Sequence, residues 1–410
     1  MEMFPVHLFV LLLLMNRYVL GSTLRKLRGA KFDETRTDYE PAVAIVVPLF
    51  NEGEGIYRTV LSLLEQEYPA EKLEIVVVDD RSTDDSLAWA RRAAEGRPQV
   101  RVIASPANQG KRKAINLGVR STEAEIIVSV DSDVIVDRRA VRQLVARFVS
   151  PRIAAVGGRT CVVNRYDNWL TKMIEVKFYF AQEWLKDLER SFRTVMCLSG
   201  CLTAYRRYVL LELEPILESR AICGVPIKYG EDRFLTRQIV KAGYQTVYTT
   251  AAYCETAAPR DLTAYFAQQL RWRRSNLVDL LGGMTHAWRL HPVVTLHYLL
   301  LLAVLLAYPV VIVHGLLTNE LFPMMVRHLG LVGLLGVIYW WDTRSLPAER
   351  RVPPWAFLPI AILMPATYLL FTPLALFTLD SGSWETRGSS QAAADTRTDA
   401  EVPLAGARSA

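Results

Sequence analysis

The sequence has few cysteines, and none of them forms a metal or redox motif. There are five in 410 residues, without a C-x-x-C pair and without the spacing of a zinc site. This pattern excludes a zinc ribbon and a disulfide-stabilised secreted scaffold. We therefore expect reduced thiols in a cytosolic domain.

The glycine-rich loops of the common nucleotide-binding folds are also absent. There is no G-x-x-x-x-G-K-[ST] and no G-x-G-x-x-G, so a nucleotide would have to be held without a P-loop or a dinucleotide fingerprint. The net charge is +6, but no nucleic-acid-binding motif accompanies it. Basic residues instead follow apolar segments, at 25–31 and 344–351, which fits the positive-inside rule and excludes nucleic acid as a partner.

Long uncharged runs lie at the two ends of the chain. Residues 4–20 contain one charged residue, Arg17, and are marginal for a membrane span of about 20 residues. A secretory signal peptide is the alternative, but the basic start and the small-x-small cleavage site are missing. We expect a retained anchor over 1–22 with its amino end outside.

Two further runs predict a pair of transmembrane helices within 293–341. Residues 293–317 and 324–341 are long and apolar enough to cross a bilayer. The tail over 389–410 is rich in Ala, Thr and Asp, and we expect it to be disordered. The chain therefore reads as a multi-pass protein of the plasma membrane with its soluble part in the cytoplasm.

Strand and helix patterns alternate through the middle of the chain. Apolar runs at 43–47, 73–78 and 125–130 predict strands that are buried on both faces. Helical segments follow each of them, which predicts a doubly wound, Rossmann-like parallel sheet of the α/β class over 41–290.

Polar residues collect where these strands end, which is the edge at which ligands of open α/β sheets bind. Asp79 and Asp80 end one strand, and Asp131 and Asp133 end another. Turn or cap chemistry is the alternative explanation for both pairs. Carboxylates at this edge also suit a divalent cation shared with substrate phosphates, so Asp131 and Asp133 predict a Mg²⁺ or Mn²⁺ site.

Other polar groups could complete such a site. A basic trio starting at Lys111 is expected in a loop near the same edge, where it could share the charge of a nucleotide diphosphate. Glu231 and Asp232 lie at the start of a predicted helix, where acids are ordinary, and one of them could act as a general base. Gln268, Arg271 and Trp272 share one helical surface. Arg271 and Trp272 could anchor the helix at the membrane interface, or equally contact a phosphate and a sugar ring.

Taken in order, these segments resemble a known family. The motifs are V-x-x-V-P-x-x-N-E, V-V-D-D-x-S-x-D, G-K-R-x-A-x-N-x-G, D-S-D, S-G-x-x-x-x-Y-R, G-E-D-R-x-L-T, Q-Q-L-R-W and, near the end, W-E-T-R. Together they resemble processive family-2 glycosyltransferases of the GT-A fold, specifically the hyaluronan synthases and nodulation-type chitin-oligosaccharide synthases. Glu231 stands where many hyaluronan synthases have Asp, which slightly favours the chitin-type relatives or a distinct bacterial branch.

The resemblance assigns a role to each motif. It implies that Asp232 is the catalytic base and that Asp131 and Asp133 hold the cation. The residues implied to bind substrate are Asp79, Asp80, Lys111, Asp131, Gln268, Arg271, Trp272, Trp384, Thr386 and Arg387. The last three belong to a gating-loop motif over 380–388. Because that motif must reach the cytosolic site, we expect residues 355–379, which contain three prolines, to be interfacial or re-entrant.

The implied reaction is inverting transfer from UDP-sugars, which gives a β-linked polysaccharide that contains GlcNAc and is exported through the bilayer. The partners would be UDP-GlcNAc, the growing polymer, the lipid bilayer and, for a hyaluronan synthase, UDP-glucuronic acid. A hyaluronan synthase is the leading expectation. A chitin-oligosaccharide synthase and the non-processive transfer of one sugar to a lipid acceptor are the alternatives.

Overall fold

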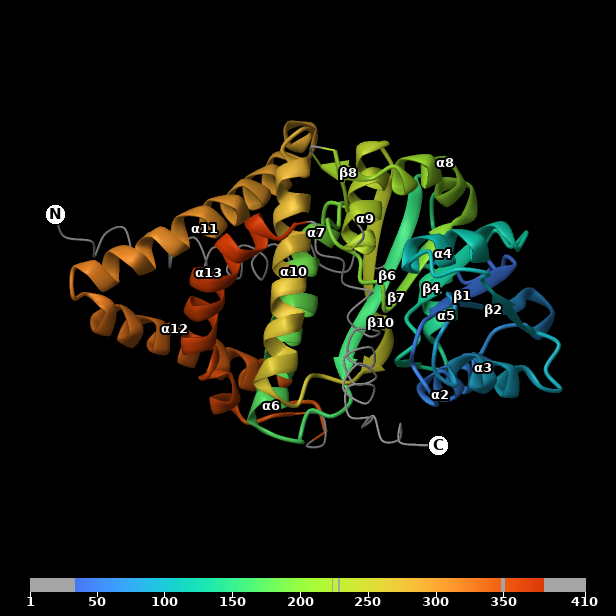
Figure 1. Ribbon diagram of the computed structural model, residues 1–410, viewed down its shortest axis with the longest axis horizontal. Coiled ribbons are helices and arrows are strands. Elements are labelled where there is room, and N and C mark those ends of the chain that lie inside the picture. Colours follow the sequence, from blue (N-terminus) through green and yellow to red (C-terminus); the bar gives the residue numbers. More distant parts are fainter. Residues whose placement is uncertain (1–33, 223, 228, 348–350, 380–410) are drawn as a thin grey trace, which may run out of the picture.

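The computed structural model describes residues 34–222, 224–227, 229–347 and 351–379. An α/β half and a helical half lie side by side in it, with the long helix α10 (Leu262–Gly283) between them (Figure 1). The predicted anchor, the gating-loop motif and the tail lie outside the described residues, so those three expectations stay predictions.

One mixed sheet of eight strands forms the α/β half, in the order β3-β2-β1-β4-β7-β6-β10-β5. The strands are β1 (Val43–Leu49), β2 (Leu73–Asp79), β3 (Val100–Ala104), β4 (Ile126–Val130), β5 (Val134–Val136), β6 (Ile153–Val162), β7 (Leu202–Arg206) and β10 (Gln245–Thr256). A separate two-stranded ribbon contains β8 (Ala221–Ile222) and β9 (Val225–Pro226).

The predicted parallel sheet is correct for β3, β2, β1 and β4, which pair in parallel. The other half differs, because β7 runs antiparallel to both β4 and β6. All five residues of β7 are buried, so its composition resembles that of a central parallel strand and does not reveal its direction. The fold is therefore of the expected α/β class, but its sheet is mixed and not wholly parallel.

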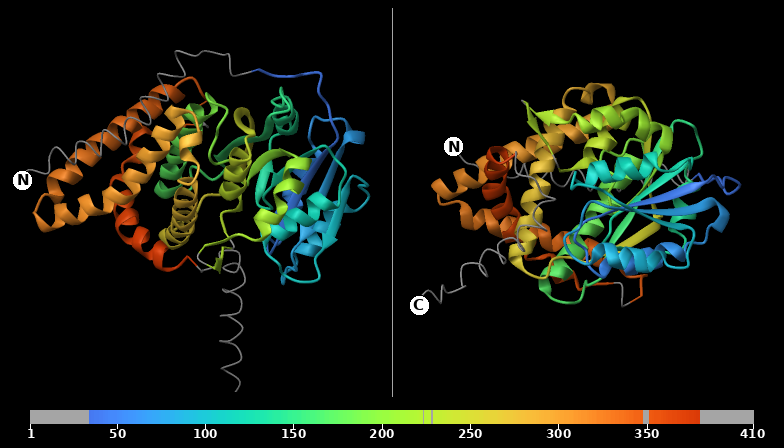
Figure 2. Two further views of the ribbon diagram at one scale, coloured as in Figure 1. Left: turned by 90° about the horizontal axis from the view of Figure 1, so that it is seen from above. Right: turned by 45° about the vertical axis from the view of Figure 1, so that its right-hand side comes forward.

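Helices cover both faces of the sheet (Figure 2), and alternating strand residues pack against the two helical layers. On one face, Ile45 and Val47 pack with α2 (Gly55–Leu64), α3 (Ser86–Ala94) and α5 (Ala140–Val145). On the other, Ala44 and Val46 pack with α4 (Lys111–Arg120), α8 (Arg207–Glu218) and α9 (Glu231–Lys241). Burial on both faces explains the uninterrupted apolar runs of these strands.

The helical half begins with α6 (Trp169–Tyr179), which continues as a π-helical turn over Phe180–Leu185 and as α7 (Lys186–Arg190). Among the described residues, three later helices are long and apolar enough to cross a membrane: α11 (Pro292–Leu317), α12 (Leu321–Thr343) and the segment Pro354–Phe377, which contains α13 (Ile360–Phe377). Pro365 and Pro373 lie inside α13 without ending it.

Candidate active site

Asp79 and Asp80 lie at the carboxyl end of β2, and both are almost fully buried. The Asp79 carboxylate accepts the backbone N–H of Ser82 at 3.3 Å. The two oxygens of Asp80 accept the backbone N–H groups of Gln109 and Gly110, at 2.8 and 2.7 Å. Asp80 therefore shapes the loop that precedes α4. Neither aspartate caps α3, whose N-cap is Asp85.

The basic trio does not lie in a loop, so that prediction is wrong. Gly110 has φ +90°, a conformation that favours glycine. The loop ends at this residue, and α4 begins with Lys111. The helix separates the three side chains. Arg112 donates to the carbonyl oxygens of Leu217 and Ile227 and is structural, whereas Lys111 reaches the end of β4.

Lys111 is bound by two acids from different elements. Its Nζ lies 2.6 Å from Asp131 Oδ1, after β4, and 3.1 Å from Glu231 Oε1, in the first turn of α9. Burial lowers the pKa of Lys111, but the two carboxylates outweigh burial and hold the pKa above its ordinary value. For Glu231, burial acts in the opposite direction and raises the pKa. The Lys111 ammonium outweighs burial and holds the pKa of Glu231 below its usual value.

Asp131 and Asp133 flank the buried Ser132, whose carbonyl oxygen accepts the Thr59 hydroxyl at 2.9 Å. Asp131 is half-buried and Asp133 is exposed. Two carboxylates are enough for Mg²⁺ or Mn²⁺, which take their other ligands from phosphate and water. Within the described ranges, no group of three His, Cys, Asp or Glu side chains could hold a metal by itself. The pair therefore fits a cation that arrives with a nucleotide.

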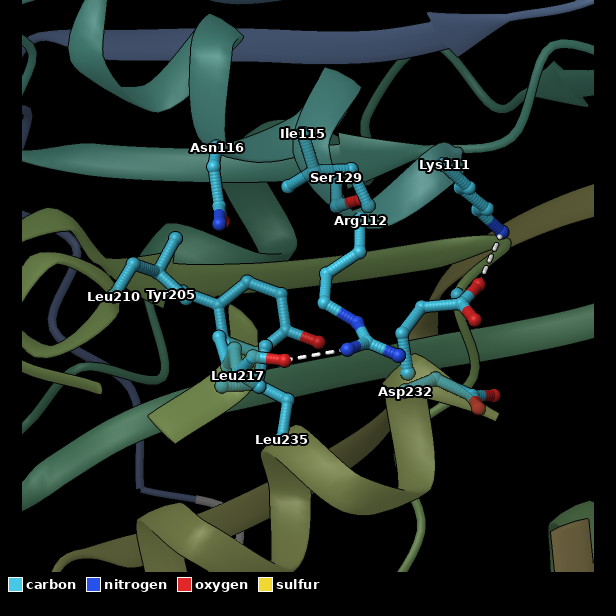
Figure 3. Close-up of a pocket in the computed structure, with 12 residues that line it drawn as sticks. Lys111, Arg112, Ile115, Asn116, Ser129, Tyr205, Leu210, Leu217, Asp232 and Leu235 are labelled. Carbon is cyan, nitrogen blue, oxygen red and sulfur yellow. Dashed lines mark hydrogen bonds and ion pairs between the residues drawn. The ribbon is translucent and has the colours of Figure 1, made fainter. Parts of the chain in front are cut away.

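The amino end of α9 is held against α10 by a close backbone approach. Gly230 has φ +66°, and a Cβ at that position would lie 2.0 Å from Ser275 Oγ of α10. This contact places Asp232 in the first turn of α9. Asp232 and Lys111 line the same pocket (Figure 3). The structure thus brings Asp232 to the edge that carries Lys111 and Asp131.

The predicted acceptor residues lie on α10. Gln268 and Trp272 are half-buried and Arg271 is exposed. The Trp272 ring packs on Phe178 of α6 with a centroid distance of 6.2 Å. The same face of α10 also contacts Lys177, which the sequence motifs did not indicate. No sequence signal identified Lys177, because its neighbours on α6 form an ordinary amphipathic pattern.

The carboxyl end of α13 returns to the site. The Tyr229 hydroxyl donates to the Leu379 carbonyl oxygen at 2.9 Å, and Tyr229 lies three residues before Asp232 in the sequence. The described chain therefore ends beside the first turn of α9, five residues before Trp384. Trp384, Thr386 and Arg387 lie outside the described residues.

Comparison with known proteins agrees with this arrangement. An N-acetylglucosaminyltransferase of Bradyrhizobium diazoefficiens is 32% identical over 366 residues, which cover 85% of this chain and 72% of that protein. An N-acetylglucosaminyltransferase of Rhizobium leguminosarum bv. viciae is 31% identical over 370 residues, which cover 87% and 84%.

A solved structure shares the fold. The mannosyltransferase PcManGT from Pyrobaculum calidifontis, in complex with GDP-Man and Mn²⁺, matches with a TM-score of 0.56 and 22% identity, over 88% of this chain and 98% of that one. Residues 41–275 match the family described as "Glycosyltransferase like family 2". The chain therefore belongs to glycosyltransferase family 2 and is a glycosyltransferase enzyme with the GT-A fold of that family.

Proposed function

We propose that this enzyme transfers GlcNAc from UDP-GlcNAc to the end of a growing β-linked GlcNAc chain, as a chitin-oligosaccharide synthase would. The observation that carries the proposal is the convergence of Lys111, Asp131 and Glu231 beside Asp232. The names of the relatives, which describe N-acetylglucosaminyl transfer, support GlcNAc as the sugar. They favour this function over the hyaluronan synthase expected first, for which the comparisons give no support.

The donor would bind along the carboxyl edge of the sheet. In this proposal Asp79 and Asp80 contact the nucleoside, and Lys111 contacts the diphosphate. Asp131 and Asp133 would hold Mg²⁺ or Mn²⁺. A bound cation would supply positive charge near the leaving diphosphate. The ammonium of Lys111 would add to that charge from the first turn of α4.

Asp232 would accept the proton of the acceptor hydroxyl as its oxygen attacks the anomeric carbon. The bond from that carbon to the UDP oxygen breaks in the same displacement. One displacement inverts the configuration, which gives a β-linkage from an α-linked donor. Glu231 is less suited to this role, because it is paired with Lys111 at 3.1 Å.

The acceptor would lie along α10. We propose that Trp272 supports a sugar ring and that Gln268 and Arg271 contact polar groups of the chain end, because aromatic faces and planar guanidinium groups suit such ligands. Trp384, Thr386 and Arg387 would close over the site. The contact between Tyr229 and the Leu379 carbonyl supports this, since it brings the chain to the site just before the motif.

Two contacts support an interfacial position for α13. The Tyr166 hydroxyl donates to the Arg351 carbonyl oxygen, and the Tyr229 hydroxyl donates to that of Leu379. Both ends of residues 351–379 therefore contact the α/β half. A helix that crossed the bilayer would carry one end away from it, so we infer that α13 lies at the membrane surface. The anchor, α11 and α12 would then be the crossings of a plasma-membrane protein with its catalytic half in the cytoplasm.

The test is incorporation of radiolabelled sugar by the purified full-length protein in detergent. We expect UDP-GlcNAc alone to give a product that chitinase degrades, with no increase when UDP-glucuronic acid is added. A product formed only when both donors are present would instead indicate a hyaluronan synthase. Mass spectrometry of product length would separate oligomer synthesis from the transfer of a single sugar to lipid.

A further inference from the structure

Lys177 belongs to α6, and its side chain extends toward the face of α10 that carries Trp272. Its Nζ donates to Gln269 Oε1 at 2.5 Å and lies 5.4 Å from the ring centroid of Tyr265 and 5.7 Å from that of Trp272. Residues 265, 269 and 272 follow the i, i+4, i+7 spacing of one helical face. Lys177 therefore points at the middle of that face.

The environment of Lys177 is unusual for a structural lysine. Among the residues that the structure describes, no carboxylate lies within ion-pair distance of its Nζ, and Gln269 is its one hydrogen-bond partner. A lysine ammonium has three N–H donors. Burial, followed by the charge of Arg273, lowers the pKa of Lys177 to about 7. If position 177 served only packing, an apolar side chain would fill it at a lower free-energy cost than a charged one.

This face is also close to the proposed reaction centre. Trp272 precedes Ser275 by three residues, and Ser275 is the residue against which Gly230 packs at the start of α9. Three helical residues span about 4.5 Å along the axis. Trp272, whose ring Lys177 approaches, therefore lies about one helical turn along α10 from Ser275, the residue that contacts Gly230.

We infer that Lys177 is an acceptor-binding residue, which donates a hydrogen bond to a hydroxyl or N-acetyl oxygen of the sugar unit that Trp272 supports. The inference rests on the proposed function and names a contact beyond the family motifs. Polar donors beside an aromatic face are the combination that recognises sugars, since the ring covers the apolar side of the sugar and the donor binds an oxygen at its edge.

The test uses the purified full-length enzyme with UDP-GlcNAc as donor and N,N′,N″-triacetylchitotriose as acceptor. We expect Lys177→Met to raise the KM for chitotriose about tenfold, the effect of losing one strong hydrogen bond, and to shorten the products. The KM for UDP-GlcNAc should change less than about twofold. Lys177→Arg, which keeps a charged donor, should recover part of the loss. Lys172→Met, on the same helix, is the matched control.

Gln269→Leu separates direct binding from helix positioning, because it removes the contact between Lys177 and Gln269 but keeps the lysine. A smaller effect than that of Lys177→Met supports direct binding, whereas an equal effect overturns it. An unchanged chitotriose KM in Lys177→Met, in a sample whose Tm shows it is folded, overturns the role of Lys177 alone. If the wild-type enzyme releases UDP but never extends chitotriose, both the inference and the proposed function fail.

Discussion

Lys111 Nζ lies 2.6 Å from Asp131 Oδ1, so a residue at the start of α4 is joined to the acid that ends β4. The same ammonium also pairs with Glu231. Within the described part of the chain, Asp232 forms no ion pair within 4 Å. This difference supports the proposal that Asp232 and not Glu231 is the base, because the Lys111 ammonium makes the Glu231 carboxylate a weaker proton acceptor.

Asp232→Asn is expected to abolish transfer. An amide cannot accept the proton of the acceptor hydroxyl, so UDP release in the presence of acceptor should fall by about 10²-fold or more. The Tm and the affinity for UDP should stay close to those of the wild type. Retained UDP release at wild-type rates would show that Asp232 is not the base.

Lys111→Met should weaken both donor binding and the fold. It leaves Asp131 and Glu231 partly buried without their cation, which costs about 3 kcal/mol for pairs of this kind, so the Tm should fall and the KM for UDP-GlcNAc should rise. Because the folded pKa of Glu231 is depressed, the stabilisation by this pair is present above its unfolded pKa and is lost as pH falls through the lower folded value. The Tm difference between wild type and variant should therefore shrink when denaturation is followed in acid.

Removing the divalent cation with EDTA should stop transfer, and Mn²⁺ or Mg²⁺ should restore it. Asp133→Asn should raise the Mn²⁺ concentration needed for half-maximal activity about tenfold or more. Asp137→Asn, a few residues further along the chain, is a suitable control and should leave that concentration unchanged. Full activity of the EDTA-treated wild type would exclude a cation held by Asp131 and Asp133.

Arg237 and Asp279 form a buried ion pair between α9 and α10, with Nε to Oδ1 at 2.7 Å. Arg237→Ala should lower stability by about 3–5 kcal/mol, because it leaves the buried Asp279 unpaired. Arg207 pairs with the exposed Glu123, and Arg207→Ala should cost less than about 1 kcal/mol of ion-pair energy. The Tm of the purified variants is the measurement, and equal losses would contradict a larger contribution of the buried Arg237–Asp279 pair.

Lys177 predicts a pH dependence of stability. Its folded pKa of about 7 lies below the ordinary value, so between these two values the unfolded chain binds the extra proton and stability rises with pH. Below about pH 7 both states are protonated and the cost of burying the charge is complete. The wild-type Tm should therefore rise relative to that of Lys177→Met between pH 7 and 9. A constant difference would mean that the pKa of Lys177 is not lowered in the folded protein.

The sequence by itself determined the order of the strands in the chain and the residues at their ends. Buried strands need apolar side chains on both faces, and ligand-binding edges need acids where those strands stop, so Asp79, Asp80, Asp131 and Asp133 could be found from pattern alone. The first turn of α9 was equally visible, since Glu231 and Asp232 precede a helical pattern that ends at Gly243.

Only the tertiary structure decided which of these residues meet. The direction of β7, the start of α4 at Lys111, and the pairing of Lys111 with both Asp131 and Glu231 depend on contacts between segments up to 120 residues apart. Local patterns do not encode such contacts, because the free energy that selects them comes from burying both partners together. For the same reason Lys177 became visible as a residue of the acceptor face only once α6 lay against α10.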